Sequence, residues 1–410
     1  MKDEVYNIIS FDFVKDFICD GSYCDSKCCG DWGIEIDNVT LMKYRNIQDK
    51  KIKKELKEKC VYLADTKKHV FKLVENGKCP FLQNDYLCHL QKKLGEDYLS
   101  DVCATYPRKF IFIDNYITES LSLSCPVVAR MLVRRTTPLV LQEYPKKLKR
   151  KRVVIWQWPR KKILLDKWLD LQCAGLKILQ NNELTIRERL LNLGLFGEAV
   201  QDLLNKDNTL QELNLLINQI TTLEQQRELA SLGNKLPNSV VDFVKDLFMI
   251  VDKYLVKKSE IFINEDDNDY MIMLEEYFQL KKENSVKKIA FLYDELVSSY
   301  QKYVLNIYPY LRENYIVHQY FRTMMPIMAE GLVVHNIVTF LIYFRIQEML
   351  LMLRAAKEKE NLTEKQVVDC ISYGAKILEH EDIFFRICSD YIVDRNYTMI
   401  DIMRIWLTFL

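Results

Sequence analysis

The chain has 410 residues, of which 49% are hydrophobic and 28% charged, with only 11 glycines and 9 prolines. This balance is typical of a helix-rich globular protein and excludes a disordered or fibrous chain, and the length allows two domains. The formal net charge is +1, so no global field attracts nucleic acid or a membrane, and electrostatic recognition must come from local patches.

Cysteines are concentrated near the N-terminus. The first segment, "MKDEVYNIISFDF", has no basic region followed by an apolar one, so we expect a soluble, cytoplasmic protein. In a reducing compartment, dense thiols indicate metal or redox chemistry rather than disulfides. Nine of the twelve cysteines lie within the first 125 residues: Cys19, Cys24, Cys28, Cys29, Cys60, Cys79, Cys88, Cys103 and Cys125.

The spacing in "CDSKCCGDWG" narrows the kind of metal site. Cys24, Cys28 and Cys29 form a C-x3-C-C knot, whereas structural zinc sites usually take pairs spaced C-x2-4-C from two knuckles. An iron–sulfur cluster takes thiolates from a close run and from distant cysteines, which this chain supplies. The radical spacing C-x3-C-x2-C is absent, because Asp31 stands where its third cysteine would be. The pattern favours an iron–sulfur cluster and leaves zinc open.

The later cysteines of this region lie beside turn and cap signals. Cys79 follows an Asn-Gly turn signal, and Cys103 precedes the Tyr-Pro-Arg sequence at 106–108. The stretch "RKFIFIDNYITESLSLSCPVVARMLV" predicts two short strands around residues 114–115 and then a helix that begins at Pro126. Cys125 would be the N-cap of that helix, where we expect the positive helix end to favour the thiolate.

The order C-x3-C-C, C-P-F-L, L-C and C-x2-Y-P-R resembles the cysteine-cluster proteins that chelate zinc or iron. Within that group, "SFDFVKDFIC", "CCGDWGIEID", "LGEDYLSDVCATYPR" and "ESLSLSCPVVAR" are similar to the flagellin lysine N-methylases. A further match, "ENYIVHQYFRTMMP" from Glu313 to Pro326, departs from the family at Met324-Met325, where an aromatic residue is usual. The resemblance implies a methyltransferase that uses S-adenosylmethionine to methylate lysine side chains of flagellin, with a [4Fe-4S] cluster in the cysteine-rich domain.

The cluster has two possible roles. An open iron would chelate the amino and carboxylate groups of S-adenosylmethionine and position its methyl group. A fully ligated cluster would instead staple the domain, and the surplus thiols favour this closed form. The alternative to an enzyme is a non-catalytic, metal-stapled interaction module with iron–sulfur or zinc. The expected ligands are Cys24, Cys28, Cys29 and Cys103, with Cys79, Cys88 and Cys125 as substitutes.

Methylation of lysine requires a neutral amine, and the ordinary lysine pKa is about 10.4. Glu119 is the first candidate base because it adjoins the cysteine framework, with Tyr106 and Asp37 as weaker choices. Each has a structural alternative: Glu119 pairs with Arg108, Tyr106 packs in a turn, and Asp37 caps a helix near Thr40. No G-x-G-x-x-G follows a strand, so a Rossmann-type cofactor site is unsupported and the S-adenosylmethionine pocket is not located.

A basic segment at 136–162 predicts a connector between a cysteine-rich domain at 1–135 and a helical domain at 163–410. Such a charge run is usually a solvated face. It could otherwise bind an acidic protein surface or, less favoured, nucleic acid. Its basic and aromatic residues are Lys146, Lys147, Lys149, Arg150, Lys151, Arg152, Trp156, Trp158, Arg160, Lys161 and Lys162.

The C-terminal part predicts an all-α domain, so the fold class is mainly α, with short strands confined to the cysteine-rich domain. Capping-box spacing at Thr185 and at Thr363 marks two helix starts. The stretch "VHNIVTFLIYFRIQEMLLMLRAAKEK" is apolar nearly all round and should be the central helix, and its most apolar part is too short and interrupted to span a bilayer. The isolated histidines 318, 335 and 380 are expected in the core or on the surface rather than as ligands.

Overall fold

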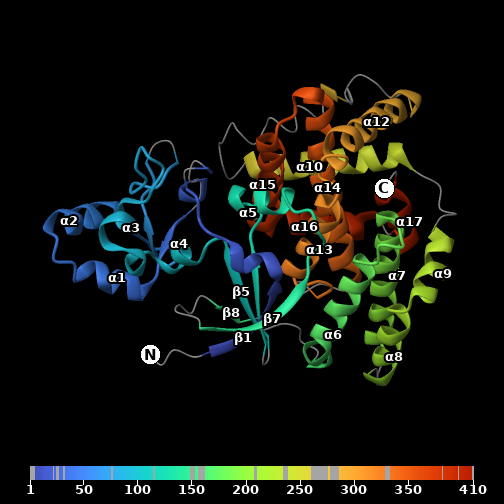
Figure 1. Cartoon of the computed structure of the whole chain (residues 1–410), viewed down its shortest axis with the longest axis horizontal. Coiled ribbons are helices and arrows are strands. Elements are labelled where there is room, and N and C mark those ends of the chain that lie inside the picture. Colours follow the sequence, from blue (N-terminus) through green and yellow to red (C-terminus); the bar gives the residue numbers. More distant parts are fainter. Residues whose placement is uncertain are drawn as a thin grey trace. The chain divides into compact units, whose positions relative to one another are not determined.

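The computed structural model divides into two compact units (Figure 1). The N-terminal unit comprises Met1–Arg130 and Val140–Trp156, and the helical unit comprises Met131–Leu139 and Gln157–Leu410. Helices dominate the described part of the chain, which confirms the mainly-α fold class. The structure describes residues 5–21, 23–24, 27–30, 33–74, 77–113, 116–147, 153–155, 162–206, 210–233, 239–259, 276–277, 286–327, 333–380, 382–395 and 397–408.

A five-stranded sheet organises one half of the N-terminal unit, in the order β7-β1-β6-β5-β8. The hairpin predicted around residues 114–115 is confirmed, since β5 and β6 pair antiparallel on either side of it. Strand β1 runs parallel to β6 and antiparallel to β7. The strands are β1 (Val5–Phe11), β5 (Arg108–Ile113), β6 (Tyr116–Leu121), β7 (Leu141–Lys147) and β8 (Val153–Ile155).

Residues 141–147, which were expected in a basic connector, form the edge strand β7 of this sheet. All seven pair with β1, from Leu141 opposite Phe11 to Lys147 opposite Val5. Lysine and proline suit an edge strand, because an edge residue faces no second partner strand there. The connector expectation therefore fails for this stretch, in which composition concealed a strand. Most of the other basic and aromatic residues of 136–162 lie outside the described residues.

The other half of the N-terminal unit is a small layer of helices on a three-stranded sheet of order β2-β4-β3. Its core contains Tyr44, Phe71 and Phe81, and Cys79 belongs to the same core. Cysteines therefore occupy positions that a larger domain would fill with aliphatic residues. The elements are β2 (Glu35–Ile36), α1 (Asn38–Arg45), α2 (Lys50–Lys59), β3 (Cys60–Leu63), β4 (Lys68–Phe71), α3 (His89–Leu94) and α4 (Asp101–Thr105).

The helical unit is all-α throughout its described residues, as the sequence predicts. Its helices are α6 (Lys162–Leu179), α7 (Ile186–Leu204), α8 (Leu210–Ile220), α9 (Leu223–Gly233), α10 (Val240–Ser259), α12 (Val286–Tyr300), the π-helix η5 (Gln301–Leu305), α13 (Leu311–Arg322), α14 (Val333–Glu358), α15 (Glu364–His380), α16 (Asp382–Arg395) and α17 (Met399–Trp406). Helix α5 (Pro126–Val133) begins in the N-terminal unit and ends in this one.

Helix α14 is the predicted central helix, and the prediction is confirmed. It packs against α7, α12, α15, α16 and α17, and it runs through the middle of the helical unit in Figure 1. In the described part of the chain it is the one helix long and apolar enough to cross a membrane. However, 94% of its most apolar window is buried inside the protein, which is how a core helix behaves.

Both predicted helix starts are confirmed. Thr185 and Glu188 form a capping box at the start of α7, with the Thr185 hydroxyl accepting from the Glu188 amide and the Glu188 carboxylate accepting from the Thr185 amide. Thr363 and Gln366 make the same two bonds at the start of α15. These exchanges satisfy N–H groups that a helix start leaves without intrahelical partners.

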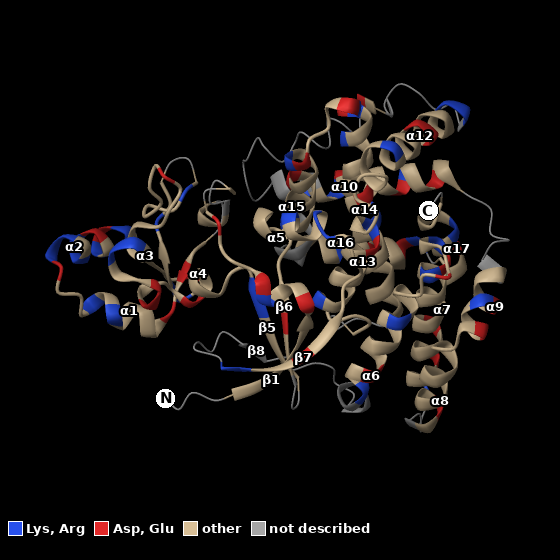
Figure 2. Ribbon diagram, in the orientation of Figure 1, with Lys and Arg blue, Asp and Glu red and all other residues tan. Residues whose placement is uncertain are grey.

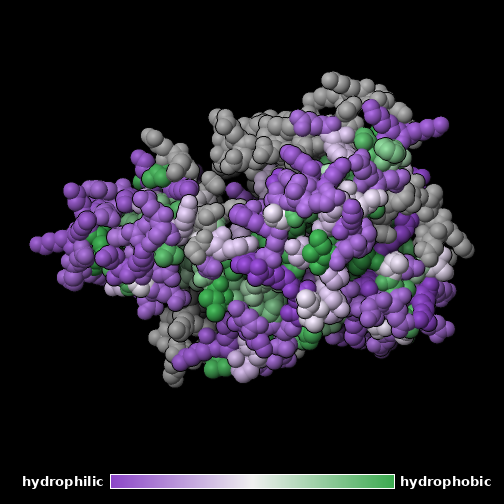
Figure 3. Space-filling view, turned by 45° about the horizontal axis from the view of Figure 1, so that its top comes forward, coloured by the Kyte–Doolittle hydropathy of each residue, from purple (hydrophilic) through white to green (hydrophobic). Residues whose placement is uncertain are grey.

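The face of the molecule drawn in Figure 3 is mainly hydrophilic. Helix α2 is mostly lysine with two glutamates, and its apolar residues Ile52 and Leu56 are buried (Figure 2). The face in Figure 3 shows hydrophobic residues scattered among hydrophilic ones. Exposed hydrophobic residues such as Ile18, Val39 and Phe291 come from different elements. Such isolated residues do not define a docking surface.

Gly175 allows α6 and α13 to approach closely. A methyl group at this position would overlap the Tyr320 ring, which is fully buried and packs edge-to-face on Phe340. We expect Gly175→Ala to destabilise the helical unit by about 1–3 kcal/mol, because overpacking outweighs the better helix propensity of alanine. Thermal unfolding tests this, with Lys177→Ala on the exposed side of the same helix as control. An unchanged midpoint would contradict it.

Candidate functional site

Short elements of the N-terminal unit hold the predicted cluster ligands. Cys28 and Cys29 lie in a single 3-10 turn, Lys27–Cys29. Cys88 immediately precedes α3, and Cys103 lies within α4. Because each element is only a turn or two long, packing rather than intrinsic propensity must fix the positions of these thiols.

Backbone bonds bring the cysteine knot beside a later loop. The amide of Cys79 donates to the carbonyl of Cys29 at 2.6 Å, and Gly30 forms a β-bridge with Lys78. A second bridge joins Leu82 to Cys88, which closes the loop. Residues separated by about 50 positions in the chain are thus held side by side by main-chain bonds.

Cys28 is at the centre of a network of interacting thiols. Burial raises the pKa of Cys19, and the neighbouring Cys28 and Cys24 raise it further. Burial also raises the pKa of Cys88, with an added contribution from Cys28. The pKa of Cys28 itself is raised, first by its hydrogen bond with Cys29 and then by burial. Cys19, which was not among the expected ligands, therefore belongs to this group.

A second group of thiols overlaps the first at Cys88. Burial raises the pKa of Cys79 to about 12, and Cys103 and Cys88 add to the effect. Burial raises the pKa of Tyr44, and Cys103, Cys60 and Cys88 contribute further. The thiols of the N-terminal unit thus influence one another's pKa values in two adjoining groups.

The start of α5 acts on the Cys125 thiol in the expected direction, but burial outweighs it. The residue does stand just before α5, which begins at Pro126 as predicted. Burial nevertheless raises the pKa of Cys125 to about 12, although the amides of Val128 and Val127 pull it down. Desolvation of the thiolate outweighs the stabilisation that the helix start supplies.

The sulfur donor atoms suit an iron–sulfur cluster or zinc. The described cysteines, however, do not form the coordination geometry of either. All twelve cysteines are free thiols. Among the described residues, no three His, Cys, Asp or Glu side chains gather closely enough to hold a metal ion. Residues 25, 26, 31 and 32 of the knot lie outside the described part. The set of ligands therefore stays a prediction.

Glu119, the first candidate base, is fully buried on β6 within a cluster of charges. Lys146 donates to both of its carboxylate oxygens at 2.6 Å, and the Tyr144 hydroxyl donates to Oε2 at 2.9 Å. The Arg108 guanidinium pairs with Oε1 at 3.2 Å, as the structural alternative anticipated. Burial and the Glu119 charge together raise the pKa of Tyr144. Both carboxylate oxygens are thus engaged by cations.

The two weaker candidates also have structural partners. The Tyr106 hydroxyl lies 3.0 Å from Ser124 Oγ, which in turn lies 2.6 Å from Ser122 Oγ. Asp37 Oδ1 accepts from the Thr40 amide at 2.8 Å and caps α1. Its second oxygen accepts from the Asp101 amide at 2.9 Å, at the start of α4. The capping role expected for Asp37 is confirmed, and it extends to a second helix.

Asp37 should make the stability of the N-terminal unit depend on pH. Burial raises the pKa of Asp37, but hydrogen bonds from the amides of Thr40 and Asp101 outweigh it and leave the pKa below 3.8. The charged cap therefore contributes stability above the ordinary pKa, and the contribution is lost as pH falls through the lowered value. We expect Asp37→Asn to cost about 1 kcal/mol at pH 7.

Urea unfolding of both proteins between about pH 3 and pH 7 measures this difference. The gap between wild type and Asp37→Asn should narrow as the pH falls below the ordinary value of 3.8. A gap that stays constant across this range would show that the carboxylate charge has no part in the cap.

Two of the three isolated histidines have described side chains. His318 is fully buried in α13, as a core residue is. His335 is half-buried near the start of α14, and burial lowers its pKa. The side chain of His380 lies outside the described part.

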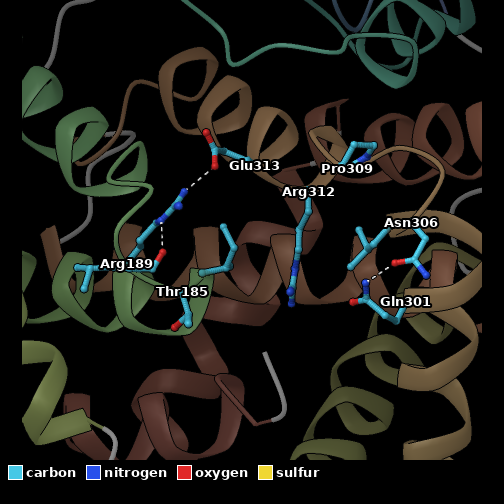
Figure 4. Close-up of a pocket in the computed structure, with 10 residues that line it drawn as sticks. Thr185, Arg189, Gln301, Asn306, Pro309, Arg312 and Glu313 are labelled. Atoms are coloured by element: carbon cyan, nitrogen blue, oxygen red, sulfur yellow. Dashed lines mark hydrogen bonds and ion pairs between the residues drawn. The ribbon is translucent and has the colours of Figure 1, made fainter.

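The helical unit contains a pocket of about 590 Å³ (Figure 4). The turn before α7 and the first turn of α7 form one side, and η5, the turn after it and the first turn of α13 form the other. Figure 4 shows Arg312 extending into the space between Thr185 and Gln301. The lining residues are Leu184, Thr185, Ile186, Arg189, Gln301, Leu305, Asn306, Pro309, Arg312 and Glu313.

Ion pairs position the charged groups of this pocket. Arg189 donates to Glu313 at 2.7 Å and to the Leu184 carbonyl at 2.8 Å. Arg312 uses Nε to pair with the buried Glu348 at 2.6 Å. Sequence reasoning did not find these arginines, although Arg189 follows the α7 capping box and Glu313 opens the C-terminal match. These positions could have been found by looking for charged residues in or beside the motifs that the sequence already showed.

Comparison with known proteins gives the class and then the family. Residues 174–405 match the model of the family described as "FliB lysine N-methylase C-terminal domain", and this range contains every residue that lines the pocket. The class defined in this way is that of the lysine N-methylases. The chain belongs to the FliB lysine N-methylase family.

Three named proteins are similar in sequence to part of this chain. The chain is 35% identical over 134 residues, or 32% of its length, to the "Flagellar biosynthetic protein FliU" of Salmonella muenchen, of which the match covers 79%. The same identity and length relate it to the "Lysine-N-methylase" of Salmonella choleraesuis (strain SC-B67) and of Salmonella typhimurium (strain LT2), but there the match spans only 33% of each relative. No solved structure matches the chain.

Proposed function

We propose that this protein is an S-adenosylmethionine-dependent methyltransferase that methylates lysine side chains of flagellin. The family match over residues 174–405 is the observation that carries the proposal. The relatives named lysine-N-methylase support the reaction class, and the relative named flagellar biosynthetic protein supports a flagellar acceptor. The alternative that the sequence left open is a non-catalytic, metal-stapled interaction module.

Before methyl transfer, the acceptor lysine must lose its proton. The neutral lysine nitrogen attacks the methyl carbon, the carbon–sulfur bond breaks, and its electron pair returns to sulfur, which converts the sulfonium to a thioether. A protonated amine has no lone pair, so the site must first remove a proton by desolvation or with a base. Glu119 and Tyr106 stay the predicted bases, although Glu119 would have to release cations in order to accept that proton.

We also propose that the cysteines of the N-terminal unit hold a [4Fe-4S] cluster that staples this unit. The concentration of nine cysteines in the first 125 residues and the influence of these thiols on one another's pKa values support it. Free thiols persist in a reducing compartment, which is consistent with the proposed cytoplasmic location. The cluster supplies cross-links between short elements, and no step of methyl transfer is assigned to it.

Metal analysis tests this cluster. We expect protein purified without oxygen to be brown and to contain iron and acid-labile sulfide in about equal amounts, with little zinc. A colourless protein that contains zinc alone would contradict the cluster and would favour a zinc-stapled fold.

Transfer of a labelled methyl group tests the enzyme proposal. Full-length, metal-loaded protein is incubated with flagellin and methyl-labelled S-adenosylmethionine, and label is expected in N-methyllysine after hydrolysis of the flagellin. Flagellin whose lysines have been fully acetylated is the control and should take up no label. Tight binding of flagellin without any transfer would contradict the enzyme and support the interaction module.

A further inference from the structure

The pocket of the helical unit has the size and wall chemistry of a small-molecule site. Its volume of about 590 Å³ falls within the usual range for ligand pockets, about 300–1,000 Å³. Leu184, Ile186, Leu305 and Pro309 give it apolar walls. A few polar groups stand among them, as in sites that bind a ligand with one apolar and one charged end.

The charges in the pocket favour an anionic group. Of the charged residues that line it, Arg189 and Arg312 are cations and Glu313 is an anion. Glu313 is already paired with Arg189, and Arg312 shares Glu348 with Arg345, so these three arginines outnumber the two glutamates by one positive charge. Figure 4 shows Arg312 extending into the space.

Arg312 is held in a fixed orientation. Its Nε pairs with Glu348, and Glu348 is buried and is itself held by Arg345 at 2.6 Å. A guanidinium carries N–H groups on three nitrogens, so a bond through Nε leaves those of the two terminal nitrogens for a ligand, and Figure 4 shows the end of the Arg312 side chain in the space of the pocket. Two terminal nitrogens side by side match the two oxygens of a carboxylate.

We propose that this pocket binds the methyl donor, with Arg312 holding the carboxylate of its amino-acid end. The inference rests on the proposed function, because it assigns the donor of that reaction to a site. The apolar walls would contact the adenosine. Gln301 and Asn306, whose side chains bond each other at 2.8 Å at the rim, present amide groups for its polar edge.

Two ligands that differ only in the amino-acid end test the assignment by calorimetry on the full-length protein. S-adenosylhomocysteine carries the carboxylate, and 5′-methylthioadenosine lacks it. For Arg312→Gln we expect the Kd of S-adenosylhomocysteine to rise about 10- to 100-fold, the usual effect of losing a charged hydrogen bond. The Kd of 5′-methylthioadenosine should change less than about threefold.

The matched control is Arg395→Gln. Arg395 also pairs with a buried carboxylate on another helix, Asp246, at 2.8 Å, but it does not line the pocket. Both Kd values should therefore stay at their wild-type level in this variant. A second variant, Asn306→Trp, would place a large ring at the rim, and it should weaken both ligands without disturbing the buried ion pairs.

The outcomes separate this inference from the proposed function. If wild type binds S-adenosylhomocysteine and transfers methyl groups, but neither Arg312→Gln nor Asn306→Trp changes its Kd, the pocket assignment is wrong and the enzyme proposal stands. If folded, metal-loaded wild type binds neither ligand, the proposed use of S-adenosylmethionine fails, and the pocket assignment fails with it. Equal weakening of both ligands in Arg312→Gln would contradict the role of the carboxylate.

Discussion

Replacing Arg345 with methionine is expected to lower the free energy of unfolding of the helical unit by about 3–5 kcal/mol. Arg345 is 1% exposed and donates to Glu348 at 2.6 Å, to the Tyr293 hydroxyl at 2.5 Å and to the Thr408 carbonyl at 3.1 Å. Methionine fills much of the same volume. It removes one of the two cations that hold the buried Glu348 carboxylate, however, and the desolvated charge then loses much of its compensation.

Urea unfolding followed by tryptophan fluorescence measures this effect, because Trp168 and Trp406 are both buried in the helical unit. Arg354→Met on the same helix is the control. Arg354 pairs with Glu358 at 3.3 Å within a partly exposed i, i+4 pair, so its loss should cost less than about 1 kcal/mol. Equal losses of stability in the two variants would show that burial does not increase the contribution of the Arg345 pair to the free energy of unfolding.

Replacing Glu119 with glutamine is expected to destabilise the N-terminal unit by about 2–4 kcal/mol. Glu119 is fully buried and joins β6 to Lys146 on β7 and to Arg108 on β5. Loss of its charge leaves both cations without their shared anion. The expected cost is below that of a wholly buried pair, because the side chains of Lys146 and Arg108 are 30% and 27% exposed and keep some contact with water.

Hydrogen exchange of the amides in β1, β6 and β7 measures the local stability, and methyl transfer is measured in parallel. Glu143→Gln, at an exposed position of β7, is the control and should change neither. If Glu119 is purely structural, exchange should quicken, and transfer should fall only as far as the folded fraction does. Loss of transfer with unchanged exchange would contradict the structural role and identify Glu119 as the base.

Local features of this protein could be read from its sequence. The capping boxes at Thr185 and Thr363 and the first residue of α5 are all where they were predicted. Each depends on residues within one turn of each other, so the signal lies in adjacent letters. The central position of α14 could also be predicted, because in a folded domain a helix that is apolar on nearly all sides is buried.

Strand β7 could not be predicted from the local sequence. The stretch "LQEYPKK" is charged and contains Pro145, and by composition it reads as a connector. It becomes a strand because β1 offers it seven residues of antiparallel pairing. Edge strands tolerate proline and lysine, so their composition resembles that of a loop. A strand of this kind is defined by its partner, which the local sequence does not reveal.

By itself, the sequence determined the family, three helix starts and the thiol-rich character of the first 125 residues, because motifs and periodicity are short-range properties. Apart from the pair of Glu119 with Arg108, only the tertiary structure decided which charges meet. Glu119 reaches Lys146 across 27 residues, and Arg189 reaches Glu313 across 124. Such pairs form because folding brings distant segments together and removes water from between them, which strengthens a charge pair and makes an unpaired charge costly.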